Sequence, residues 1–257
     1  MLELMEITVQ NKDGVAMAYQ YEKIINCIEV EYHCQVIYFT TNADGESKKG
    51  HKILVKHRPW MWAPDCWAHQ SQLVLRDHFK EYNAARDISE LATSLIRWLN
   101  NHGKVHKPFD EAQEQISLNC MGYIVILTYL VANLTQWITH CIAFICLHTL
   151  QDSLKLAMLQ QWGVIIKAQV GMATSSEKLA LQANAKKHCN LISNSSFWNG
   201  LEIVIGDIEP ICYATNINQT DCTHLDQVLL TLVGMYLHFA EHPEPTVQDG
   251  MKKWLEK

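Results

Sequence analysis

Four polar side chains between residues 42 and 69 follow short apolar runs, at positions where metal binding or proton transfer could occur. Asn42 and Asp44 follow an apolar run at 36–39, and Cys66 and His69 follow a second short apolar run. A run of four apolar residues is too short for a helix and is typical of a buried strand. Side chains just past the carboxyl end of such a strand are where α/β sheets place their chemistry. We therefore treat these four as the candidate catalytic residues.

The residue type at position 42 argues against metal-dependent chemistry. Asn42 carries a neutral amide, which lacks the negative charge that hard cations such as Mg²⁺ require. Asp44 could substitute for it. On residue type alone, however, the sequence Asn-Ala-Asp-Gly is more often a turn than a metal site.

Cys66 and His69 stand three residues apart, a spacing at which two side chains on one helical turn can meet. A zinc site needs two more ligands, and His33-Cys34 is the only nearby Cys/His pair. We favour a structural role, a buried thiol and a hydrogen-bonded imidazole at a strand-to-helix junction. The alternative is a zinc-stabilised regulator, and we assign no metal ligands.

Three stretches of the chain resemble the central part of hAT-superfamily DNA transposases, in the form abundant in mushroom-forming fungi. They are FTTNADGESKKGHK from Phe39, RPWMWAPDCWAHQSQLVLRDHFK from Arg58 and YLVANLTQWITHCIAF from Tyr129. Cys66-x-x-His69 matches the C/DxxH element of that superfamily. The resemblance implies a ribonuclease H-like core interrupted by an all-helical insertion. In that core three carboxylates hold Mg²⁺ or Mn²⁺ for phosphodiester cleavage and strand transfer.

The same resemblance implies that this chain is a truncated copy. It would begin after the first family carboxylate and end before the last, and Asn42 falls on the position of the family's other Asp. We therefore expect a transposase-derived protein without catalysis or a metal cofactor. Its implied partner is DNA and its implied location the nucleus; self-association is possible and no membrane contact is expected. The alternative is a non-enzymatic helical interaction module or DNA-binding remnant.

The candidate DNA-binding residues are an indole and a basic cluster. Trp137 lies where the family pattern reads Thr-Arg-Trp, and the resemblance implies that its ring stacks on a flipped base. The alternative is a tryptophan packed in a helical core. Lys48, Lys49 and Lys52, with neighbouring His51, Lys56 and Arg58, could pair with phosphates. A solvated helix face explains these cations as well, and we favour it.

The expected fold is mixed α and β but mostly α. An incomplete ribonuclease H-like α/β layer over residues 1–103, with short strands at 36–39 and 60–63, precedes an all-helical insertion-type domain at 104–257. Apolar spacing predicts helices at 14–32 and 46–57, a helix that starts at residue 66, and another that starts at a capping box at 87–90. Further helices are predicted at about 109–118, 121–148, 151–169, 175–191, 196–207, 226–241 and 246–256.

Composition indicates an ordinary globular protein. Of the 257 residues 48% are hydrophobic and 19% charged, and the net charge of −6 argues against a free-standing nucleic-acid binder. The nine cysteines are scattered and form no CxxC pair, and the N-terminus shows no signal-peptide pattern. Together these two observations indicate a reducing compartment. The apolar stretch Met121–Leu134 is shorter than the roughly 20 residues of a membrane span, so we predict a buried helix there.

Overall fold

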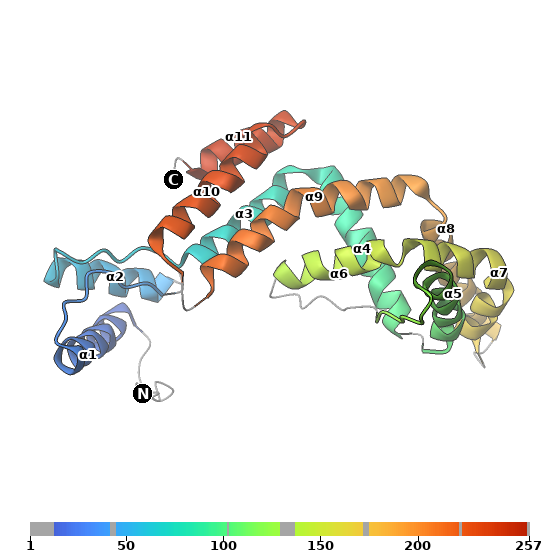
Figure 1. Cartoon of the computed structure of the whole chain (residues 1–257), viewed down its shortest axis with the longest axis horizontal. Helices are drawn as coiled ribbons and strands as arrows, with labels where there is room; N and C mark the ends of the chain where they lie inside the picture. The colour runs from blue at the N-terminus through green and yellow to red at the C-terminus, as the bar shows by residue number, and fades with distance from the viewer. Residues whose placement is uncertain are drawn as a thin grey trace. The chain divides into compact units, whose positions relative to one another are not determined.

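The computed structural model describes residues 13–41, 45–101, 103–128, 137–171, 175–220 and 223–255. It is mostly helical (Figure 1), and its residues group into two compact units, Met1–Ser71 and Gln72–Lys257. The division falls earlier than the boundary predicted near residue 103. The reason is that α4 (Asn83–Asn101) packs against α9 (Ser195–Asn218), which joins the residues before 103 to the helical part.

The first unit is built from two helices and two extended segments. Helix α1 (Gly14–Tyr32) begins at Asp13, whose Oδ1 accepts hydrogen bonds from the amides of Val15 and Ala16. It packs against α2 (Gly45–His57), and both helices confirm the predicted ranges to within a residue. A β-carbon at Gly50 would lie 2.9 Å from the Tyr21 ring, so the close approach of the helices requires glycine there.

The two predicted strands pair in parallel but form only isolated bridges, Tyr38 with Trp62 and Thr41 with Asp65. The amide of Phe39 donates to Trp62 O at 3.0 Å, and that of Trp62 donates to Ile37 O at 2.9 Å. The described residues contain no strand, so the mostly helical class is confirmed and the partial sheet layer stays a prediction. Pro59 and Pro64 flank the second segment and limit its ladder.

The second unit is all helical and has one continuous apolar core. Its largest fully buried side chains include Leu95, Phe144 and Trp198. Besides α4 and α9 it comprises α3 from residue 72 onward (the whole helix is Trp67–Glu81), α5 (Gly103–Met121), α6 (Trp137–Thr149), α7 (Gln151–Val170), α8 (Ser175–Ile192), α10 (Leu225–Ala240) and α11 (Pro245–Leu255). In Figure 1, α10 and α11 run side by side.

Two helix predictions in this unit are wrong over part of their length. The expected helix at 121–148 is not helical at 122–128, where α5 ends at Gly122 with φ +75°. The prediction at 196–207 is too short, because buried residues such as Ile208 and Ile211 continue the apolar face of α9 past the predicted end. Residues 129–134 of the predicted buried helix lie outside the described residues.

Candidate functional site

The predicted site lies at the junction of the two paired segments. Asn42 and Asp44 are outside the described residues, but Thr41, which precedes them, is placed against the start of α3. Thr41 O accepts a hydrogen bond from the Cys66 amide at 3.0 Å, and Cys66 O accepts from the Gln70 amide as the helix begins. The backbone therefore brings the end of the first segment to the Cys-x-x-His element.

Cys66 and His69 are both partly buried, and neither side chain hydrogen-bonds to another described residue. Over the described ranges, no three His, Cys, Asp or Glu side chains are grouped so that they could hold a metal ion. The described residues therefore provide no third ligand for a zinc site at Cys66 and His69. The hydrogen-bonded imidazole expected in the structural interpretation is not seen either.

Hydrogen bonds and an ion pair of neighbouring side chains stabilise the ends of the two paired segments. The Trp67 indole N–H donates to the Tyr38 hydroxyl at 3.1 Å, so this ring is half-buried and hydrogen-bonded. Buried His51 lies with its Nε2 2.9 Å from Thr41 Oγ1, which ties α2 to the end of the first segment. Lys48 Nζ lies 3.1 Å from the Asp65 carboxylate. These contacts fix the positions of both segment ends.

The basic cluster is smaller than the sequence predicts. His51 is buried, and the Arg58 guanidinium is only 12% exposed because it pairs with Glu29 at 2.9 Å. Lys48 is exposed but ion-paired. The remaining lysines of the cluster, Lys49, Lys52 and Lys56, are exposed on α2. They keep the predicted solvent-facing position in which a lysine can meet phosphate.

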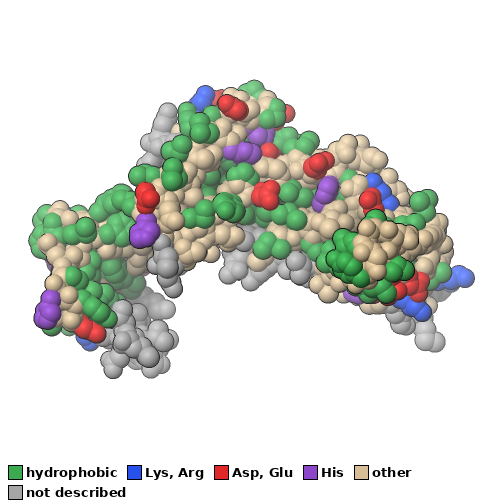
Figure 2. Space-filling view, viewed as in Figure 1, with side chains coloured by type: hydrophobic (Ala, Val, Ile, Leu, Met, Phe, Trp, Pro, Cys, Tyr) green, Lys and Arg blue, Asp and Glu red, His purple; other side chains and the backbone are tan. Residues whose placement is uncertain are grey.

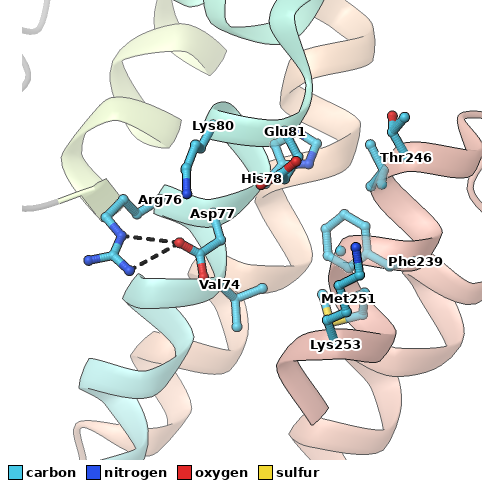
Figure 3. A pocket seen from close by; sticks show the side chains of 12 residues that line it. Val74, Arg76, Asp77, His78, Lys80, Glu81, Phe239, Thr246, Met251 and Lys253 are labelled. Atoms are coloured by element: carbon cyan, nitrogen blue, oxygen red, sulfur yellow. Dashed lines mark hydrogen bonds and ion pairs between the residues drawn. The ribbon is translucent and has the colours of Figure 1, made fainter. Parts of the chain in front are cut away.

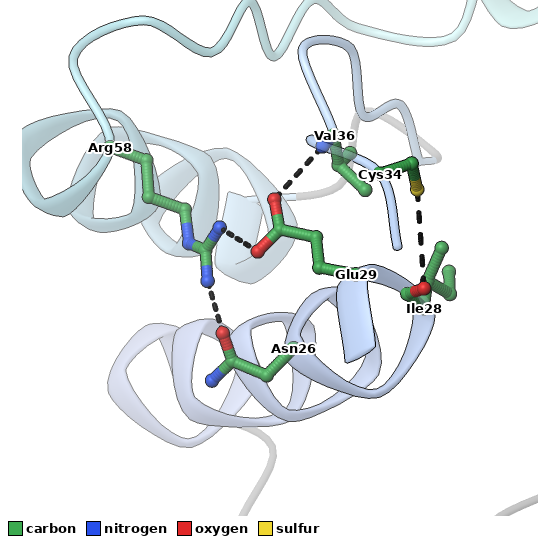
Figure 4. A network of polar contacts seen from close by, with 6 residues as sticks. All are labelled: Asn26, Ile28, Glu29, Cys34, Val36 and Arg58. Atoms are coloured by element: carbon green, nitrogen blue, oxygen red, sulfur yellow. Dashed lines mark hydrogen bonds and ion pairs between the residues drawn. The ribbon is translucent and has the colours of Figure 1, made fainter. Parts of the chain in front are cut away.

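Figure 4 shows the network that removes Arg58 from that cluster. Arg58 donates to the Glu29 carboxylate and to Asn26 Oδ1, and Glu29 also accepts from the Val36 amide at 2.9 Å. These bonds lower the pKa of the Glu29 carboxyl, with the Arg58 hydrogen bond as the largest cause. The network joins α1 to both extended segments.

Trp137 is the first residue of α6. Its side chain is not among those that the structure describes, so the role of its ring in base stacking stays a prediction.

A second group of polar side chains, which the sequence analysis missed, lies in the interior of the second unit. Asp207 of α9 accepts a hydrogen bond from His242 Nε2 at 3.1 Å, and its other oxygen lies 3.5 Å from His78 Nε2 of α3. The His242 Nδ1 accepts from the Glu244 amide, and its Nε2 is the nitrogen that donates to Asp207. We call His78, Asp207, His238 and His242 the histidine–aspartate cluster.

Burial sets the protonation of this cluster. It lowers the pKa of His78 to about 4, and the nearby His242 and His238 add to that effect. Burial also raises the pKa of the Asp207 carboxyl and lowers that of His238. His78 is therefore a neutral imidazole at pH 7, and neither of its nitrogens has a hydrogen-bond partner among the described residues.

His78 borders a pocket of about 240 Å³ between α3 and α11. Figure 3 shows the Arg76–Asp77 ion pair at the rim, with nitrogen and oxygen 3.0 Å apart. The pocket has an apolar part (Val74, Phe239, Val247 and Met251) and a charged part (Arg76, Asp77, Lys80, Glu81 and Lys253). Both ring nitrogens of His78 are buried, so the imidazole forms part of the pocket wall and does not offer a nitrogen to a molecule in the pocket.

Acid should destabilise the second unit through His78. The His78 imidazole has a pKa of 6.5 in the unfolded chain but of about 4 in the folded chain. The free energy of unfolding therefore falls as the pH drops from 6.5 towards 4. The raised pKa of the Asp207 carboxyl, which is caused by burial, acts in the opposite direction. From pH 7.5 to 5 we expect a loss of about 2 kcal/mol, measured by urea unfolding. The variant His78→Gln should lose much less; an identical loss would contradict this assignment.

A Ser–His pair lies between α4 and α8. Ser94 Oγ is 3.1 Å from His188 Nε2, and His188 Nδ1 donates to Asn184 O at 2.9 Å. This arrangement is that of a nucleophile, a base and an orienting group. Ser94 lies within α4, however, where the amides are bonded inside the helix and cannot stabilise an oxyanion. The imidazole also stacks on Trp98 with rings 5.1 Å apart, which indicates a structural brace.

Sequence spacing gives one signal for the histidine–aspartate cluster. His238 and His242 are four residues apart at the end of α10 and just beyond it, whereas His78 and Asp207 come from distant helices. No sequence pattern links the three elements.

Comparison with known proteins gives no match among family models, curated proteins or solved structures. The resemblance to hAT transposases therefore rests on the three sequence stretches alone.

Among the described helices, none by itself has the length and apolar character to cross a membrane. The two segments Thr139–Thr149 and Gln151–Val170 meet that requirement only as a pair, with a bend of 49° between them.

Proposed function

We propose that this chain is a transposase-derived protein of the hAT type that binds DNA without cleaving it. The observation that carries the proposal is the parallel pairing of the segment ending at Thr41 with the segment ending at Asp65, around α2. The resemblance implies that the second metal-binding carboxylate of a ribonuclease H-like core follows the strand equivalent to residues 36–39. Here Asn42 directly follows Thr41.

The absence of chemistry follows from the residue type at this position. A two-metal site needs negatively charged ligands to hold Mg²⁺ or Mn²⁺ between attacking and leaving oxygens. Asn42 contributes none. The chain would then retain the surface of a DNA-processing core, including the exposed lysines of α2, without its nuclease centre.

The experiment that tests this proposal titrates a fluorescent DNA duplex with the protein and follows anisotropy and strand integrity together. We expect binding at physiological salt with a dissociation constant of about 10⁻⁶–10⁻⁴ M, the range of non-specific binding. No cleavage product should form with either Mg²⁺ or Mn²⁺. Cleavage that a chelator abolishes would contradict the lack of catalysis, and a complete lack of binding would contradict the role in DNA binding.

A second candidate function is a non-enzymatic interaction module. One observation favours it: α10 exposes an apolar stripe with Leu230 69%, Val233 53% and Leu237 58% accessible. Figure 2 shows hydrophobic side chains at several places on the surface seen from this side. Exposed apolar faces of this kind are typical of protein contacts. Failure of the DNA titration would leave this function as the better one.

A further inference from the structure

Residues 124–128 are in no helix or strand, and the backbone of Val125 and Leu127 is anchored along α5. The Val125 amide donates to Ser117 Oγ at 3.0 Å, and the Leu127 amide donates to Gln113 Oε1 at 2.7 Å. The Gln113 side chain returns a bond to Leu127 O at 3.3 Å. Ser117 and Gln113 are one helical turn apart, about 6 Å, which matches the roughly 6.6 Å spanned by two residues of extended chain.

The bonds to α5 use one edge of the segment, and on the other edge the Thr128 carbonyl accepts from Cys146 Sγ at 3.1 Å. Backbone groups of an extended chain point to alternate edges, so those of Val125 and Leu127 face α5 and those of Ile124 and Ile126 face away. Over the described ranges, the N–H and C=O groups of Ile124 and Ile126 have no hydrogen-bond partner. Their side chains are 58% and 46% exposed. The segment therefore presents a free strand edge.

The chemistry of this edge limits what can cover it. Another extended chain supplies backbone donors and acceptors at the spacing of residues 124 and 126. Residues 121–128 carry no charge, so a charged strand would bury its charges here without partners. In an antiparallel pair of two copies centred on Val125, each isoleucine lies opposite an isoleucine, so no polar side chain is opposed to an apolar one.

We propose that residues 124–126 pair with the same residues of a second copy of this chain. With the two-fold axis at Val125, Ile124 lies opposite the partner subunit's Ile126, and Ile126 lies opposite the partner subunit's Ile124. Each of these two pairs exchanges two hydrogen bonds, so four backbone bonds form and every free group named above is satisfied. Because the segment is uncharged, the net charge of −6 adds no repulsion at the contact itself.

The test compares self-association of the full chain with that of two variants at position 126. Ile126→Pro removes only the outward N–H and leaves the bonds of Val125 and Leu127 to α5 in place. Ile126→Val keeps the N–H and the branched side chain and is the matched control. By sedimentation equilibrium we expect dimers for the wild type and Ile126→Val, and at least a tenfold weaker association for Ile126→Pro, about 1.4 kcal/mol.

Residue-resolved amide exchange of the wild type gives a second readout that needs no variant. The amides of Ile124 and Ile126 should gain protection as the protein concentration rises, while those of Val125 and Leu127 stay protected throughout. A monomeric wild type would overturn the proposal, and so would a dimer that Ile126→Pro leaves unchanged. If Ile126→Pro does not fold by circular dichroism, concentration-independent exchange of Ile124 and Ile126 overturns it.

Discussion

Replacing Trp198 with alanine is expected to cost about 3–5 kcal/mol of the free energy of unfolding. The side chain is 1% exposed in the core of the second unit, and its indole N–H donates to Ile192 O at 2.7 Å. The ring also packs against Phe197, with ring centres 5.0 Å apart. Removal therefore leaves a cavity and an unpaired carbonyl at the end of α8.

The matched control for this variant is Trp162→Ala on α7, because that ring is 38% exposed. We expect it to cost well under half as much in the same urea titration. Equal losses at the two positions would show that Trp198 is not the core residue described here.

Replacing Leu54 with alanine is expected to unfold the first unit selectively. Leu54 is fully buried, and only three other apolar side chains, Tyr21, Ile25 and Met61, are buried with it among the described residues. A cavity there costs about 2–5 kcal/mol, and a unit of this size has little more than that to lose. Amides of α1 and α2 should lose exchange protection while those of α9 keep it.

Val55→Ala is the control for Leu54→Ala, since Val55 is the next residue along the same helix and is 36% exposed. It should leave the protection of α1 and α2 almost unchanged. Loss of protection in both units together in Leu54→Ala would mean that they unfold as one.

Helices with a regular apolar face were predictable from the sequence. Those at 14–32, 226–241 and 246–256 match α1, α10 and α11 to within one or two residues, because a buried stripe fixes both the type and the extent of a helix. Capping signals were less reliable: α4 begins at Asn83, before the predicted cap at Asp87. The apolar face starts earlier than the cap and decides where the helix begins.

The segment at 122–128 shows what apolar content alone does not reveal. Its residues are apolar enough for a buried helix, but Ile124, Val125 and Ile126 are β-branched and favour extended chain. What fixes the extended form is the pair Gln113 and Ser117, whose side chains accept the segment's amides. Such contacts depend on which helix lies alongside, and no local pattern encodes that.

The candidate site was predictable only in part. The approach of Thr41 to Cys66 follows from two short apolar runs separated by a helix, which favours parallel pairing. The histidine–aspartate cluster depends on how α3, α9 and the end of α10 pack, so Asp207 gives no signal in the sequence. The burial of His51 likewise results from packing, because its position on α2 faces Tyr21 and Phe39.

The salt dependence of DNA binding by the lysines of α2 tests the central claim most directly. Each lysine that contacts a phosphate contributes about 0.9 to the slope of log affinity against log salt. The double variant Lys49→Ala/Lys52→Ala should therefore reduce that slope by about 1.8. The control Lys186→Ala/Lys187→Ala on α8 should keep the wild-type slope. Equal slopes for wild type and the α2 variant would contradict DNA binding through this helix.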